Sequence, residues 1–326
     1  MFSQHLWTNV HVFILRLVCK LFMDGFGVSI AWARPMHEQT IAASIEFKGI
    51  GLHTGEMATV RILPAPAGKG IVFRRVDLDN FELRADVGSV ARVAYATTLM
   101  SRGVWISTVE HLLSALYGIG VDNAYIELDN FEVPILDGSA MQYTEAIARV
   151  GLASQGRPRQ YIRITKEFVL KEREKTLGIY PSDTFSMKYD IDFPHPLIGK
   201  QSLEVTLTGS QYADFIAPAR TFGFFHEVET LQASGLVRGG SLENAIVLTQ
   251  DGMLNDTSLR FPDEFVRHKM LDLLGDFALI GQPVLGRLVA NRAGHALHTR
   301  FVAELLDSTS HWELGTAAAI SVPSGR

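Results

Sequence analysis

The sequence lacks the residues for a disulfide or for a thiolate metal site, because its 326 residues include a single cysteine, Cys19. One cysteine cannot form an intrachain disulfide, so packing must stabilise the fold, and a reducing compartment fits this composition. A zinc finger is excluded for the same reason. Any zinc site in this chain would need histidine and carboxylate ligands.

Concentrated positive charge is also missing. The formal net charge is -5, and no run of five or more basic residues occurs, which argues against a sequence-wide attraction to nucleic acid. Hydrophobic residues make up 47% and charged residues 20% of the chain, an ordinary balance for a globular protein with real cores. The length allows about two domains of roughly 100–200 residues each.

The apolar stretch at residues 11–33 has too many charges for a membrane-spanning helix, which needs about 18 or more uncharged residues. The residues that interrupt it are Arg16, Lys20 and Asp24. Ala31-Trp-Ala33 resembles a signal-peptidase site only superficially, since these charges lie inside the would-be apolar region. We treat residues 1–35 as an N-terminal extension, either disordered or translated from a misassigned start upstream of Met36. Membrane association and a cleaved segment stay open as alternatives.

Strand patterns dominate the first third of the chain, where glycines 49, 51 and 55 predict the loop of a hairpin. Ser107-Thr-Val-Glu110 is a capping-box pattern that predicts the start of a helix, and the glycines at 118 and 120 predict its end. Further helices are expected at 141–150, 263–275 and 295–306. Strands are expected at 41–47, 57–63, 70–75, 124–128, 161–170, 176–180, 185–193 and 284–290.

The two halves of the chain look related. When His111 is aligned with His268, a leucine follows each at +5, and a glycine at +7 predicts the end of each helix, which suggests a duplicated strand–helix unit. Ser154-Gln-Gly-Arg-Pro158 is the best linker candidate. We therefore expect a first α+β domain at 36–155, a second at 156–312 and a C-terminal tail at 313–326.

His268-Lys-Met-Leu-Asp272 places an imidazole and a carboxylate one helical turn apart on one face, where both can reach a single ion. A solvated helical pair is the ordinary alternative. Glu110-His111 is the second candidate, although Glu110 could serve only the capping box and His111 could be a core histidine. Zinc catalysis needs three protein ligands, one open position and a carboxylate base. Ligands 157 residues apart would place such a site at the seam between the halves.

Six segments resemble signature segments of the UDP-3-O-acyl-N-acetylglucosamine deacetylases. Together they run from about Ile41 to His311, in order and with plausible spacing, which makes chance agreement negligible. The segments are Gly49-Ile-Gly-Leu-His-Thr-Gly55, Ser107-Thr-Val-Glu-His-Leu112, Pro134-Ile-Leu-Asp-Gly-Ser139, Arg220-Thr-Phe-Gly-Phe224, Gly239-Gly-Ser-Leu-Glu-Asn-Ala-Ile-Val247 and Phe265-Val-Arg-His-Lys-Met-Leu-Asp272.

The resemblance implies an α+β protein of two similar domains, each a β-sheet packed against helices, forming a layered sandwich with zinc at the seam. It implies hydrolysis of the acetamide of UDP-3-O-acyl-N-acetylglucosamine, which releases acetate and the free amine in the committed step of lipid A biosynthesis. The implied zinc ligands are His111, His268 and Asp272. The implied catalytic groups are Glu110 as general base, His295 as electrophilic or general-acid partner, Asp276 as its orienting carboxylate and Thr221 as an oxyanion donor.

Substrate binding is implied at Lys269, Phe222, Gly240 and Ser241, and the insert near residues 229–248 matches the lining of an acyl-chain passage. Core packing or ordinary turns would explain the same residues without a ligand. His53 matches a histidine close to the metal, or is simply exposed on its loop. We expect His226 and His298 at the surface.

The implied partner is a UDP-linked acylated glucosamine and not a nucleic acid, in the cytoplasm, with peripheral association at the inner membrane as an open alternative. Iron can replace zinc in sites of this kind. Two other classes compete with the enzyme: a non-catalytic binding protein that retains the fold, and a structural α+β protein with fortuitous histidines. Acyl-chain length and oligomeric state are not predicted.

Overall fold

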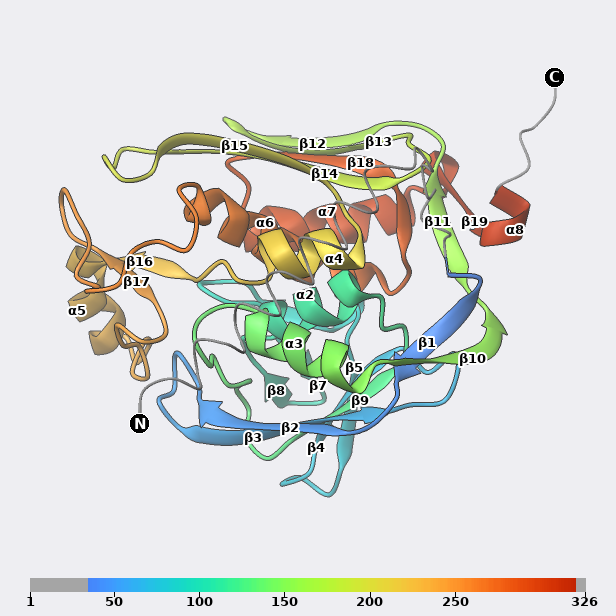
Figure 1. Cartoon of the computed structure of the whole chain (residues 1–326), viewed down its shortest axis with the longest axis horizontal. Helices are drawn as coiled ribbons and strands as arrows, with labels where there is room; N and C mark the ends of the chain where they lie inside the picture. The colour runs from blue at the N-terminus through green and yellow to red at the C-terminus, as the bar shows by residue number, and fades with distance from the viewer. Residues whose placement is uncertain (1–34, 321–326) are drawn as a thin grey trace, which may run out of the picture. The chain divides into compact units, whose positions relative to one another are not determined.

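Two β-sheets form outer layers, and helices lie between them (Figure 1). The computed structural model describes residues 35–320. The interpretation of the N-terminal extension therefore concerns residues that lie, apart from Pro35, outside the described ones. Among the described helices, none has the length and apolar character that crossing a membrane requires.

The first sheet has five strands in the order β2-β3-β9-β4-β5. Along β3, Ala58, Val60 and Ile62 are buried and alternate with more exposed residues, the period-two pattern of a sheet with one covered face. Helices α2 (Glu110–Ile119) and α3 (Met141–Val150) lie against this sheet (Figure 1). The strands are β2 (Ile45–Ile50), β3 (Met57–Pro64), β9 (Ala124–Leu128), β4 (Ile71–Arg75) and β5 (Phe81–Arg84).

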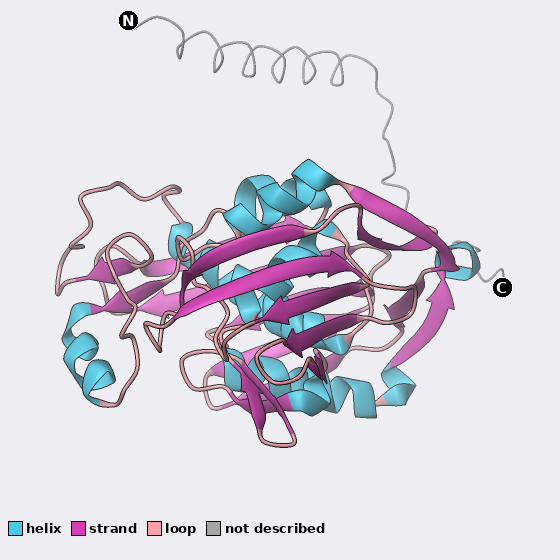
Figure 2. Ribbon diagram, turned by 90° about the horizontal axis from the view of Figure 1, so that it is seen from below, coloured by secondary structure: helices cyan, strands magenta, loops and turns pink. Residues whose placement is uncertain are grey.

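The second sheet has seven strands, ordered β12-β13-β18-β11-β19, with β14 pairing both β18 and β15. Helices α6 (Glu264–Phe277) and α7 (His295–Asp307) lie against it, and Figure 2 shows strands side by side with helices behind them. The strands are β11 (Gln160–Ile164), β12 (Phe168–Glu172), β13 (Lys175–Tyr180), β14 (Phe185–Phe193), β15 (Gly199–Thr206), β18 (Val284–Asn291) and β19 (Trp312–Thr316). The α+β layered architecture is thus confirmed.

Smaller elements join these layers. A three-stranded sheet contains β6 (Val90–Arg92), β7 (Thr98–Ser101) and β8 (Val104–Ile106). The parallel pair β16 (Phe222–Phe224) and β17 (Ile246–Leu248) lies at one end with helix α5 (Phe225–Ala233) (Figure 1). Short helical segments are α4 (Gly209–Gln211), α8 (Ala317–Ile320), a π-turn at Tyr212–Ile216, and 3₁₀ turns at Val87–Ser89, Ala278–Ile280 and Thr309–His311.

Three expectations about local structure were wrong. The linker proposed at 154–158 is part of β10 (Leu152–Pro158), which pairs with β1 (His37–Ile41); an exposed strand satisfies its backbone by pairing and does not need apolar side chains. The single strand expected at 161–170 is divided into β11 and β12. Strand β19 extends the second sheet into the segment expected as a tail, by pairing with β11.

A fourth correction concerns the two glycines expected at +7 to end helices. Gly118 and Gly275 both lie inside helices that continue to Ile119 and Phe277. Gly120, the second glycine predicted to end α2, is its left-handed C-cap. A Cβ on Gly275 would lie 2.0 Å from the carbonyl oxygen of Glu110, so α2 and α6 approach each other backbone to backbone. Glycine is needed at this crossing for close packing rather than for helix termination.

Candidate metal centre

Helix α2 begins at Glu110 and not at Ser107, so the predicted capping box is wrong. Thr108 has φ +57°, a left-handed conformation in which the chain turns before the helix, and the N-cap residue Val109 makes no side-chain capping bond. The Ser107 hydroxyl instead pairs with that of Thr98 at 2.9 Å. The Glu110 carboxylate is thereby free to face the protein interior.

The structure brings together His111 from α2 with His268 and Asp272 from α6. One potential ligand atom from each lies within 4.8 Å of those of the other two. Asp272 Oδ1 is 3.3 Å from His268 Nε2 and 3.6 Å from His111 Nε2. All three residues are buried, with exposed fractions of 6% or less.

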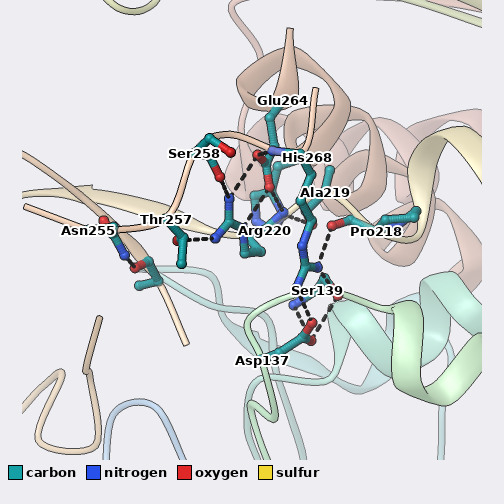
Figure 3. A network of polar contacts seen from close by, with 12 residues as sticks. Asp137, Ser139, Pro218, Ala219, Arg220, Asn255, Thr257, Ser258, Glu264 and His268 are labelled. Carbon is teal, nitrogen blue, oxygen red and sulfur yellow. Dashed lines mark hydrogen bonds and ion pairs between the residues drawn. The ribbon is translucent and has the colours of Figure 1, made fainter. Parts of the chain in front are cut away.

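The protonation of His268 indicates what this cluster can bind. Its Nδ1–H donates to the carbonyl oxygen of Ala219 at 3.1 Å (Figure 3), which leaves Nε2 as a lone pair in the neutral ring. Burial lowers the pKa of His268 to about 4 despite the nearby Asp272, so the ring is neutral at pH 7. Two acceptors, Nε2 and the Asp272 carboxylate, then face each other, and a cation between them would remove the repulsion.

Charge and donor type also fit a divalent metal. Burial opposes ionisation of Asp272, but the neighbouring cations and hydrogen-bond donors, Lys269 among them, outweigh burial and lower the pKa of that carboxyl well below its ordinary value. His111 Nδ1 is buried without a hydrogen-bond partner. Two imidazoles and one carboxylate are a ligand set that zinc accepts, and three protein ligands leave a coordination position open.

A second cluster lies close by, where Asp276 on α6 meets His295 and His298 on α7. Asp276 Oδ2 accepts from the Nδ1–H of His295 at 2.6 Å and from that of His298 at 2.8 Å. These three residues are also close enough to share an ion. The two rings, however, each direct an Nδ1–H group at the same Asp276 oxygen. This cluster is therefore a hydrogen-bonded triad and not a metal site.

The triad favours a charged His295. Burial opposes the imidazolium form, but the Asp276 carboxylate outweighs burial and raises the pKa of His295 to about 9. For Asp276, burial is likewise opposed by His295 and His298, and its pKa falls to about 2. At neutral pH the pair is a carboxylate and a protonated histidine.

Glu110 faces both clusters. It is only 3% exposed, and burial raises its pKa against the attraction of His295 and His111. Its Oε2 accepts from the backbone N–H of Thr97 at 3.0 Å. A carboxylate with a raised pKa beside a buried cluster of imidazoles can accept and return a proton.

Two residues of this region were missed in the sequence. His298, expected at the surface, is 1% exposed; its spacing of three residues from His295 on one helix was the available signal. Thr97 donates its hydroxyl to Asp276 Oδ1 at 2.5 Å and its N–H to Glu110. It lies in a loop with no motif, and nothing in its local sequence marks it.

The residues expected to bind substrate lie in two places. Lys269 Nζ donates to Asp272 Oδ2 at 2.8 Å and lies 5.7 Å from the centre of the Phe222 ring, whose centre is 6.3 Å from that of His268. Gly240 and Ser241 lie between α5 and β17, where the Ser241 N–H donates to Asn244 Oδ1 at 2.8 Å. His53 is buried, and both its ring nitrogens lack partners; His226 is exposed, as expected.

Thr221 and the Ala219 carbonyl belong to one segment, which a buried ion pair holds in place. Arg220 bonds Glu264 Oε1 through its Nε at 2.9 Å and through its backbone N–H at 3.0 Å (Figure 3). The Thr221 N–H donates to the Gly138 carbonyl at 2.8 Å. This segment therefore fixes the orientation of His268 and connects the second half to the first.

Comparison with known proteins identifies the family to which the chain is similar. Residues 38–307 match the family model described as UDP-3-O-acyl N-acetylglycosamine deacetylase. A UDP-3-O-acyl-N-acetylglucosamine deacetylase from Solibacter usitatus is 46% identical over 279 residues, covering 86% of this chain and 94% of the relative. Proteins of the same name from Teredinibacter turnerae and Geotalea uraniireducens are 42% and 40% identical, covering 86% and 85% of this chain and 93% and 91% of the relatives.

Proposed function

The chain belongs to the UDP-3-O-acyl-N-acetylglucosamine deacetylase family, and from this premise we propose that it is a zinc-dependent hydrolase of the acetamide of that nucleotide-sugar, acting in lipid A biosynthesis. The observation that carries the metal proposal is the buried lone pair of His268 Nε2, which faces the Asp272 carboxylate at 3.3 Å. The proposed ligands are His111, His268 and Asp272. When bound, zinc supplies Lewis-acid chemistry that polarises a carbonyl and acidifies water.

Glu110 is the proposed general base. Its raised pKa suits a group that must take a proton from water and hold it near neutral pH. The N–H of Thr97 fixes one carboxylate oxygen, which leaves the other available for the proton. Attack of the water oxygen on the acetyl carbon and cleavage of the C–N bond would yield acetate and the amine.

His295 is the proposed proton donor to the leaving amine. An amine leaves poorly unless it is protonated, and a histidine with a pKa of about 9 carries that proton at neutral pH. Asp276 fixes the ring through Nδ1, so Nε2–H is the group available for donation. Thr221 is proposed to stabilise the oxyanion of the tetrahedral intermediate, an effect worth about 3 kcal/mol for a single donor.

Substrate contacts and location complete the proposal. Lys269, Phe222, Gly240 and Ser241 are proposed to bind the nucleotide-sugar, and the segment 229–248 to line the passage for the acyl chain. We further propose division into two α+β domains with their boundary near β10, and a cytoplasmic location, where the UDP-sugar would be the partner. Peripheral contact with the inner membrane would suit an acylated substrate.

Acetate release from the acylated UDP-sugar tests this function. Purified protein should release acetate, lose the activity after treatment with a zinc chelator and recover it when zinc is restored. A protein that binds the nucleotide-sugar but releases no acetate with zinc present would instead be a non-catalytic binding protein.

A further inference from the structure

Glu132 is a buried carboxylate that the proposed chemistry does not use. It is 1% exposed and lies between β9 and α3, in a segment that runs beside Ser107. Its two oxygens accept three hydrogen bonds from two distant parts of the first half. The donors are the Thr108 hydroxyl at 2.8 Å, the His53 N–H at 2.9 Å and the Thr54 N–H at 2.8 Å.

The hydrogen bond from Thr108 to Glu132 stabilises a residue whose backbone conformation is unfavourable. Thr108 has φ +57°, and a β-branched residue in the left-handed region is a genuine outlier whose cost the surroundings must offset. The turn at Thr108 sets the direction in which α2 begins. Glu110 and His111 are the first two residues of that helix, so the turn determines where both side chains lie.

The other two bonds reach the glycine-rich loop. A Cβ on Gly51 would lie 2.3 Å from Glu132 Oε2, so the carboxylate fills the space that a side chain there would take. The same loop receives the backbone of the 229–248 insert, because Gly239 N–H donates to the Leu52 carbonyl at 3.0 Å. One carboxylate therefore joins the start of α2 to the loop on which the insert rests.

We propose that Glu132 is a positioning residue, which holds Thr108 in its left-handed turn and so aims Glu110 and His111 into the metal centre. The effects on kcat and KM that this inference predicts rest on the proposed function. The backbone effect is a property of the folded chain and can be measured without substrate or metal.

The test compares glycine with alanine at position 108. Thr108→Ala removes the hydroxyl and keeps a Cβ in the left-handed region, whereas Thr108→Gly adopts that region without strain. We expect kcat to be about tenfold higher for Thr108→Gly than for Thr108→Ala, because the cost of one left-handed alanine corresponds to roughly a tenfold change in the population of the correctly turned chain. The glycine variant should also have the higher melting temperature as metal-free protein. KM should be similar in the two variants, because the loop contacts of Glu132 are intact in both.

The second part of the test uses the Glu132→Gln variant. It should lower kcat and also raise KM, since the amide disturbs the loop as well as the turn, and adding Thr108→Gly should restore part of kcat but not KM. Equal or better kcat and melting temperature for Thr108→Ala than for Thr108→Gly would overturn the proposal, as would wild-type kinetics for Glu132→Gln. If the unmodified protein releases no acetate, the proposed function fails, and the metal-free melting temperatures still decide the role of Glu132: Glu132→Gln should melt below the unmodified protein, and adding Thr108→Gly should recover part of the loss.

Discussion

His268 and His298 are both buried imidazoles beside an aspartate of α6, yet their nitrogens are used differently. His268 donates Nδ1–H to the Ala219 carbonyl and turns a lone pair toward Asp272. His298 donates Nδ1–H directly to Asp276. The acceptor of the Nδ1–H therefore decides the role of each ring: His268 can bind a cation through Nε2, whereas His298 stabilises the Asp276 carboxylate.

Replacing Glu110 with glutamine tests the base without disturbing the ligands. The amide keeps the size of the side chain and can still accept from Thr97, but it cannot take a proton. We expect Glu110→Gln to retain zinc and to lose roughly 10²–10⁴-fold in kcat, the usual contribution of a positioned acid–base group. Zinc content and acetate release on the same preparation provide the measurement; unchanged turnover would remove Glu110 from its role.

The pH dependence of activity reports on His295. Because its pKa is raised to about 9, the protonated form is present at neutral pH and is lost as the pH rises through that value. The rate of amide hydrolysis should therefore fall on the alkaline side, and His295→Gln should lose this alkaline limb together with most of the rate. A profile of kcat/KM between pH 6 and pH 10, with about half-unit steps, is the measurement. A rate that keeps rising to pH 10 would rule out His295 as the proton donor.

Helices and strands with clear periodicity were predictable from the sequence, and loops that depend on distant contacts were not. The expected helix at 141–150 and the strand at 124–128 agree with α3 and β9. The start of α2 was misplaced because Thr108 takes a left-handed turn that Glu132 supports from another segment. The candidate metal residues could be named from motifs, but Ala219, whose carbonyl orients His268 from 49 residues away, could not.

Helices α2 and α6 cross at the seam between the two halves, and their close contact holds the residues of the candidate metal centre together. Gly275→Ala would place a methyl group 2.0 Å from the Glu110 carbonyl oxygen, so the two helices must separate. We expect a loss of about 1–3 kcal/mol in the free energy of unfolding, or more if the backbones cannot move, with weaker zinc binding.

Gly209→Ala is the matched control, because its added Cβ meets nothing within 4 Å. Denaturant unfolding of both variants measures the difference. If Gly275→Ala is as stable as Gly209→Ala and binds zinc normally, the helices are not in close backbone contact.

At the scale of the whole molecule, neither half holds the site alone. His111 and Glu110 come from the helix packed on the first sheet, whereas His268, Asp272, Asp276 and His295 come from helices packed on the second. Apolar residues of both halves also form one continuous buried cluster. A metal ion that binds across this seam must stabilise the folded chain, because the residues that hold it are far apart once the chain unfolds.

Zinc content measured alongside thermal unfolding tests the convergence of the three ligands most directly. The account predicts about one zinc per chain in the unmodified protein, a melting temperature that falls when a chelator removes the metal, and a His268→Ala variant that neither binds zinc nor responds to the chelator. A His268→Ala protein that still holds zinc in equal amount and releases acetate at the normal rate would contradict it.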